Sequence, residues 1–194
     1  MRERGEIQRV LSRYGAIEEG RGDDWNDLEL IQEVARAYSL AGNAGKVEQY
    51  FLRCADLNSK RAALYHIQIG WFYQRKKRWG RALAWYDRAL ETFPTYHLCL
   101  FRKGYCLERL HRPRPAIAAL EAAAASYEAA APEQQERSRG IQAQVLFHLA
   151  RNRREVGDTA RAREALDRFY GRSQSRAEIA AAFGMVENGV KTLL

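Results

Sequence analysis

A recurrence of small and aromatic residues at an interval of 34 positions is the feature that most restricts how this chain can fold. Gly70 is followed by Tyr73, Ala82, Tyr86 and Pro94. A step of 34 residues from Gly70 leads to a second glycine, Gly104. Small or apolar residues again follow it: Ala116, Leu120 and Ala123. Small residues at fixed places allow two helices to pack closely. The interval therefore predicts stacked helical hairpins.

Further copies of the pattern extend the array in both directions. The copies start near residues 28, 63, 97 and 143, so the last interval is longer than the others by about a dozen residues. We expect the alanine-rich run after Ala116 to lengthen the second helix of the third copy. We expect the polar residues between Pro132 and Gly140 to form a loop.

This order of residues resembles the tetratricopeptide repeat, whose signature has Gly, Tyr, Ala, an aromatic residue and Pro at the matching places, although His66 replaces its Trp. The resemblance implies an all-α fold, a right-handed superhelix of about four helical hairpins with capping helices. Residues 28–170 would form the repeat array. Residues 1–27 would form an N-terminal capping helix and loop, because apolar residues recur at helical spacing between Ile7 and Ile17.

Composition and cysteine usage limit where such a chain can work. No stretch is apolar and long enough to cross a bilayer, and the first ten residues interleave charges with single apolar side chains. We therefore expect a cytoplasmic protein that does not enter membranes. Cys54, Cys99 and Cys106 have no CxxC spacing, so buried reduced thiols are expected rather than zinc ligands or a disulfide.

The motifs that common enzyme classes require are missing from the sequence. It contains no nucleophile with an adjacent base, no phosphate-binding glycine loop and no spaced metal ligands. The four histidines lack HxH or HxxxH spacing, and we expect His148 to be a surface contact. We therefore expect a protein that is not an enzyme and that needs no cofactor and no metal.

The resemblance also implies where a partner binds, because the first helix of each repeat lines a concave groove in this family. The implied groove is apolar and aromatic in its middle, with arginine at its ends, and Trp71 and Tyr105 hold the same position one repeat apart. This implies a non-catalytic scaffold or adaptor for a protein or peptide segment with apolar or aromatic anchors. The predicted groove residues are Arg36, Leu64, Ile67, Trp71, Gln74, Leu98, Phe101, Tyr105, Phe147, Arg151 and Arg154.

Nucleic-acid binding is the alternative function. The chain has a net charge of +8, and Arg75–Arg78 form a basic cluster, which we interpret as a solvated turn between helices. Residues 175–194 resemble the helix-turn-helix segment of bacterial regulators in Glu178, Ile179, Gly184 and Lys191. The same tail is also compatible with a plain capping helix or with the first strand of a cold-shock-like barrel. The sequence leaves these three interpretations of residues 171–194 open.

Overall fold

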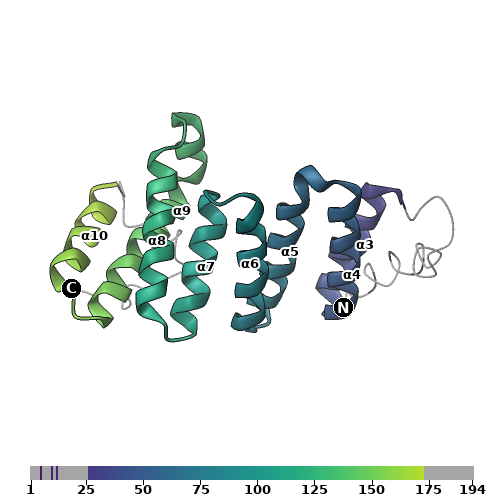
Figure 1. Ribbon diagram of the computed structural model, residues 1–194, viewed down its shortest axis with the longest axis horizontal. Helices are drawn as coiled ribbons and strands as arrows, with labels where there is room; N and C mark the ends of the chain where they lie inside the picture. The colour runs from purple at the N-terminus through teal and green to yellow at the C-terminus, as the bar shows by residue number, and fades with distance from the viewer. Residues whose placement is uncertain (1–4, 6–9, 11, 13–25, 173–194) are drawn as a thin grey trace. The chain divides into compact units, whose positions relative to one another are not determined.

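The computed structural model of the protein describes residues 5, 10, 12 and 26–172, and within residues 26–172 every regular element is a helix. The chain divides into two units, Met1–Thr92 and Phe93–Leu194. The first unit contains α3 (Leu28–Ala41), α4 (Ala44–Leu57), the 3-10 helix η2 (Ser59–Arg61), α5 (Ala62–Arg75) and α6 (Trp79–Thr92). The second contains α7 (His97–Arg109), α8 (Pro113–Glu128), α9 (Pro132–Glu155) and α10 (Thr159–Arg172) (Figure 1). In each unit, helices that follow one another in the chain pack together. The predicted all-α fold of stacked hairpins is confirmed.

The first hairpin, α3 and α4, is bounded by polar caps and a glycine. The Asp27 carboxylate accepts hydrogen bonds from the backbone N–H groups of Glu29 (3.0 Å) and Leu30 (3.1 Å), which satisfies donors that the first helical turn leaves without partners. Gly42 has a φ of 82°, a conformation that favours glycine, and it ends α3. Asn43 then caps α4 by accepting from the Lys46 N–H at 3.2 Å.

Gly70 brings α5 and α6 into close contact. A Cβ atom at this position would lie 2.7 Å from Cε1 of Tyr86, whose ring is fully buried and whose hydroxyl donates to Gln74 Oε1 at 2.7 Å. The basic cluster at 75–78 contains the last residue of α5 and the turn that follows, and all four side chains are exposed, as the sequence indicated. The second unit repeats the contact, because a Cβ at Gly104 would lie 2.6 Å from Cγ of Leu120.

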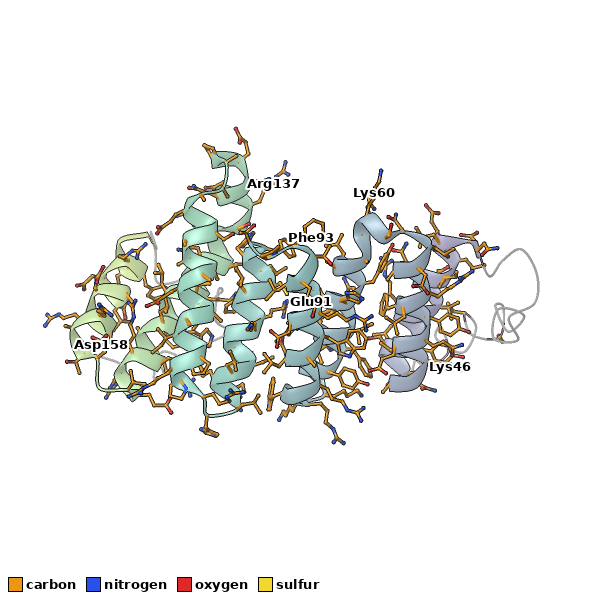
Figure 2. All side chains as sticks on the ribbon, in the orientation of Figure 1. Lys46, Lys60, Glu91, Phe93, Arg137 and Asp158 are labelled. Carbon is orange, nitrogen blue, oxygen red and sulfur yellow. The ribbon has the colours of Figure 1, made fainter. Side chains whose placement is uncertain are left out.

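The fourth hairpin differs from the sequence-based expectation. Residues 132–140 are not a loop: they are the first turns of the 24-residue helix α9, and Arg137 marks this segment in Figure 2. Pro132 occupies the first turn of α9, where a missing backbone N–H costs nothing. The extra residues before the fourth copy therefore lengthen its first helix, while α8 ends at Glu128.

A pair of glycine substitutions tests this correction. Gly140→Ala should stabilise the protein by about 0.5–1 kcal/mol, because the residue is in a helix interior and a Cβ atom added there would meet nothing within 4 Å. Gly70→Ala should instead destabilise it by about 1–3 kcal/mol, since the added methyl meets the buried Tyr86 ring. Urea unfolding measures both. A Gly140→Ala variant that is less stable than the parent protein would contradict a helical residue 140.

Candidate functional site

An exposed row of side chains runs from the residue just before α5 along one face of the helix, and we call it the α5 row: Arg61, Leu64, Gln68, Trp71 and Arg75. Their spacing of three or four residues places them on one side of the helix. Leu64 is 42% exposed and Trp71 is 41% exposed. The Arg75 guanidinium carbon lies 5.4 Å from the centre of the Trp71 ring, within cation–π range. Leu64 and Trp71, both predicted groove residues, therefore form an apolar centre between arginines.

Three other predicted groove residues of the first unit lie in different settings. Ile67 is only 8% exposed, so its side chain packs inside the unit and does not point outward as expected. Gln74 is half-buried and accepts the Tyr86 hydroxyl, which gives it a structural role between α5 and α6. Arg36 on α3 is exposed. Burial raises the pKa of the Tyr65 hydroxyl, and the charges of Arg61 and Arg36 oppose this rise, so both arginines act on the same part of the first unit.

In the second unit, the predicted aromatic groove residues surround a histidine. The rings of Phe101, Tyr105 and Phe147 have centroids 5.9, 5.3 and 5.5 Å from the His148 ring. Phe101 and Phe147 are buried, whereas Tyr105 and Leu98 are partly exposed. Arg151 and Arg154 are exposed on α9. Leu98 and Tyr105 therefore remain candidates for contact with a partner, while Phe101 and Phe147 fill the core.

A buried polar cluster beneath these residues was missed by the sequence analysis. Glu108 is 7% exposed, and its Oε2 lies 2.9 Å from His148 Nδ1 and accepts from Asn152 Nδ2 at 2.6 Å. Arg151 Nη1 lies 3.4 Å from the other carboxylate oxygen. Burial alone would raise the pKa of Glu108, but the hydrogen bond and charge of His148, with the Arg151 charge and the Asn152 hydrogen bond, hold it below its ordinary value. His148 is thus a buried structural partner, and the expectation of a surface contact is wrong.

The described residues offer little reactive chemistry. All three cysteines are buried and free, as predicted, and burial raises the pKa of Cys54 and of Cys106 to about 12. Such thiols stay protonated and unreactive near neutral pH. Among the described residues, no group of three or more His, Cys, Asp or Glu side chains could hold a metal ion. In the same part of the chain, no helix is long and apolar enough to cross a membrane.

Two predictions fall on residues that the structure does not describe. Most of the expected N-terminal capping helix lies within residues 1–25, outside the described ranges. The tail at 175–194, with its helix-turn-helix-like pattern and its alternatives, also lies outside them. Both remain predictions from sequence.

The hairpin architecture, with small residues at the helix contacts, defines the class of helical-repeat proteins. Residues 144–173 match the family model of the tetratricopeptide repeat, and this range covers the second part of α9 and all of α10. The chain therefore contains a tetratricopeptide repeat and has the fold of that family, as its sequence indicated. No curated protein matches the chain in sequence.

Solved structures with the same fold support this assignment. A MamA structure, residues 41 to the end, from Desulfovibrio magneticus RS-1 has a TM-score of 0.62 and 17% identity, over 90% of this chain and 94% of its own. The TPR-like repeats of a putative kinesin light chain from Podospora anserina have a TM-score of 0.61 and 14% identity, over 93% of this chain and 89% of that chain. A Rap protein complexed with Competence and Sporulation Factor has a TM-score of 0.56 and 20% identity, over 91% of this chain and 48% of that chain. At these identities the likeness concerns the fold alone.

Proposed function

We propose that this chain is a non-catalytic binding scaffold whose α5 row holds a segment of a partner protein through apolar anchors. The fold is that of interaction scaffolds in general, and the Rap structure contains a bound factor. The observation that carries the proposal is the exposure of Leu64 and Trp71, seven residues apart on one helix face. Together they form an apolar surface on α5 that a partner segment would cover.

The energetics of interfaces support Trp71 as the main anchor. Tryptophan and arginine are enriched among the few residues that dominate binding energy. Trp71 carries the Arg75 guanidinium against its ring, so it presents a stacked aromatic and cationic pair to a partner. Leu64, two helical turns earlier, supplies a second apolar contact about 10 Å away. Partner contact at both points fixes the direction of a bound segment along α5.

The second unit repeats the pattern of the row. Four residues of α7 lie 34 positions after residues of the α5 row: Leu98 after Leu64, Arg102 after Gln68, Tyr105 after Trp71 and Arg109 after Arg75. Leu98 and Tyr105 are less exposed than Leu64 and Trp71, and the Tyr105 ring meets His148 edge-on. We therefore assign the partner contact to the α5 row of the first unit.

Photo-crosslinking tests the proposal and also captures the partner for identification. A photoreactive residue in place of Gln68, which is exposed between Leu64 and Trp71, should form adducts with partner proteins in a lysate of the source cells. The same probe in place of Gln49, an exposed residue of α4, provides the matched control. Adducts specific to position 68 should disappear in the Leu64→Ser/Trp71→Ser background. Identical adducts from both positions, unaffected by the double substitution, would refute binding at the α5 row.

A further inference from the structure

Basic side chains lie at both ends of the α5 row. Lys60 and Arg61 precede α5, Arg75 ends it and Lys76 follows, and all four side chains are exposed. Lys60, labelled in Figure 2, marks the first of these ends. α5 itself contains no Asp or Glu. Within the described part of the chain, neither Arg61 nor Arg75 forms an ion pair.

The first of these basic pairs lies between two helix ends: Lys60 and Arg61 end η2, where cations are favourable, and precede α5. The N-terminus of a helix carries partial positive charge, so with respect to α5 alone the two residues lie at the end where cations are unfavourable. The first turn of α5 contains no acidic residue, and no side chain caps it. By contrast, Arg75 lies at the C-terminal end, where a cation is favourable, and it also contacts the Trp71 ring. Both basic pairs are therefore compatible with helix-end electrostatics, and what they share is their position on either side of Leu64 and Trp71.

We propose that the α5 row selects an acidic partner segment, with two apolar anchors about 10 Å apart and carboxylates on both sides of them. This inference rests on the proposed function and adds the chemistry of the partner. Leu64 and Trp71 receive the anchors, Arg61 and Lys60 receive carboxylates at one end, and Arg75 and Lys76 receive them at the other. Arginine pairs with carboxylates in a bidentate geometry that adds specificity. Glu29 and Glu33 are exposed on α3, so the first unit is not uniformly basic and the basic residues considered are those of α5 and its ends.

The arrangement differs from a general attraction of a basic protein for acidic molecules. The net charge of +8 would act on any acidic peptide and would fade with added salt. The α5 row instead places the charges at fixed distances from two apolar side chains, with Arg61 and Arg75 about 21 Å apart along the helix. Selectivity should therefore depend on these two arginines and not on arginines elsewhere.

Selection from a library of random displayed peptides tests the inference. Peptides retained by the parent protein should contain paired apolar residues flanked by Asp and Glu. The Arg61→Glu/Arg75→Glu variant should keep the apolar preference, lose the acidic one, and bind a selected acidic peptide at least about tenfold more weakly. The Arg114→Glu/Arg163→Glu variant changes the net charge equally through two exposed arginines of the second unit and should select the same peptides as the parent.

The outcomes separate this inference from the proposed function. If the acidic preference persists in Arg61→Glu/Arg75→Glu, or vanishes equally in Arg114→Glu/Arg163→Glu, the α5 row does not select carboxylates. If the apolar preference then still depends on Leu64 and Trp71, the proposed function survives without the acidic partner. If Leu64→Ser/Trp71→Ser selects the same peptides as the parent, both fail. Circular dichroism of each variant confirms that it is folded.

Discussion

Replacing Glu108 by alanine should destabilise the second unit by about 3 kcal/mol, because removal of one partner from a buried polar cluster leaves the others without compensation. His148 Nδ1 and Asn152 Nδ2 would lose the acceptor that lies 2.9 and 2.6 Å from them. Asn152 keeps its hydrogen bond to the His148 carbonyl oxygen at 2.7 Å, and the exposed Arg151 can be hydrated again. The loss of unfolding free energy should therefore lie near the lower end of the range for buried ion pairs from which one partner is removed. Hydrogen exchange of α7 and α9 in increasing urea measures the change within this unit.

The pH dependence of the same variant provides an internal check. Because the folded pKa of Glu108 is lowered, its ionisation stabilises the protein above the ordinary carboxyl range, and this contribution disappears as the pH falls through the lowered value. The stability difference between the parent and Glu108→Ala should therefore narrow below pH 4.5, the ordinary value for glutamate. Glu164→Ala on α10, an exposed control, should change stability by no more than about 0.5 kcal/mol. Equal effects of the two substitutions near neutral pH would contradict a buried cluster.

The repeat pattern predicted the helical hairpins because the two helices of a hairpin approach each other closely at fixed places. Only small residues fit at these places. The predicted starts at 28, 63 and 97 lie within one residue of the observed starts of α3, α5 and α7. Gly70 meets Tyr86 and Gly104 meets Leu120, the contacts for which small residues are required. Such contacts link residues within one repeat, so a spacing in the sequence can reveal them.

The start of α9 could not be predicted from polarity. Residues 132–140 are mostly polar and begin with proline, a composition that is common in loops. The same composition is compatible with a helix in which proline occupies the first turn and most side chains face solvent. Ser138 alone is buried in this segment, so the apolar periodicity that identifies a packed helix is absent.

The burial of groove candidates also depends on contacts that a single helix does not encode. Ile67 and Trp71 are four residues apart on neighbouring positions of one face, yet one is buried and the other is exposed. Glu108 and His148 are 40 residues apart in the chain and meet only because α7 and α9 pack together. Arg61 and Arg75 were missed as members of the α5 row, although their spacing from Leu64 and Trp71 would have identified them.

Replacing both Leu64 and Trp71 by serine should weaken binding of a partner segment by about 100-fold, which corresponds to about 2.7 kcal/mol. The loss combines two apolar contacts with the Arg75 stacking that Trp71 supports. Both side chains are about two-fifths exposed in the folded chain, so serine at both positions also removes some apolar packing, and binding is compared at a temperature where the variant is folded. Phe93 is the matched control: it is 45% exposed, precedes α7 and lies outside the α5 row (Figure 2).

The dissociation constant of one partner segment, identified by crosslinking at position 68 and then synthesised, tests the central claim most directly. Fluorescence polarisation should give nearly equal values for the parent protein and Phe93→Ser, and a value about 100-fold higher for Leu64→Ser/Trp71→Ser. Circular dichroism should show that all three are equally folded. A folded Leu64→Ser/Trp71→Ser variant that binds within about threefold of the parent would contradict the claim that the α5 row is the binding surface.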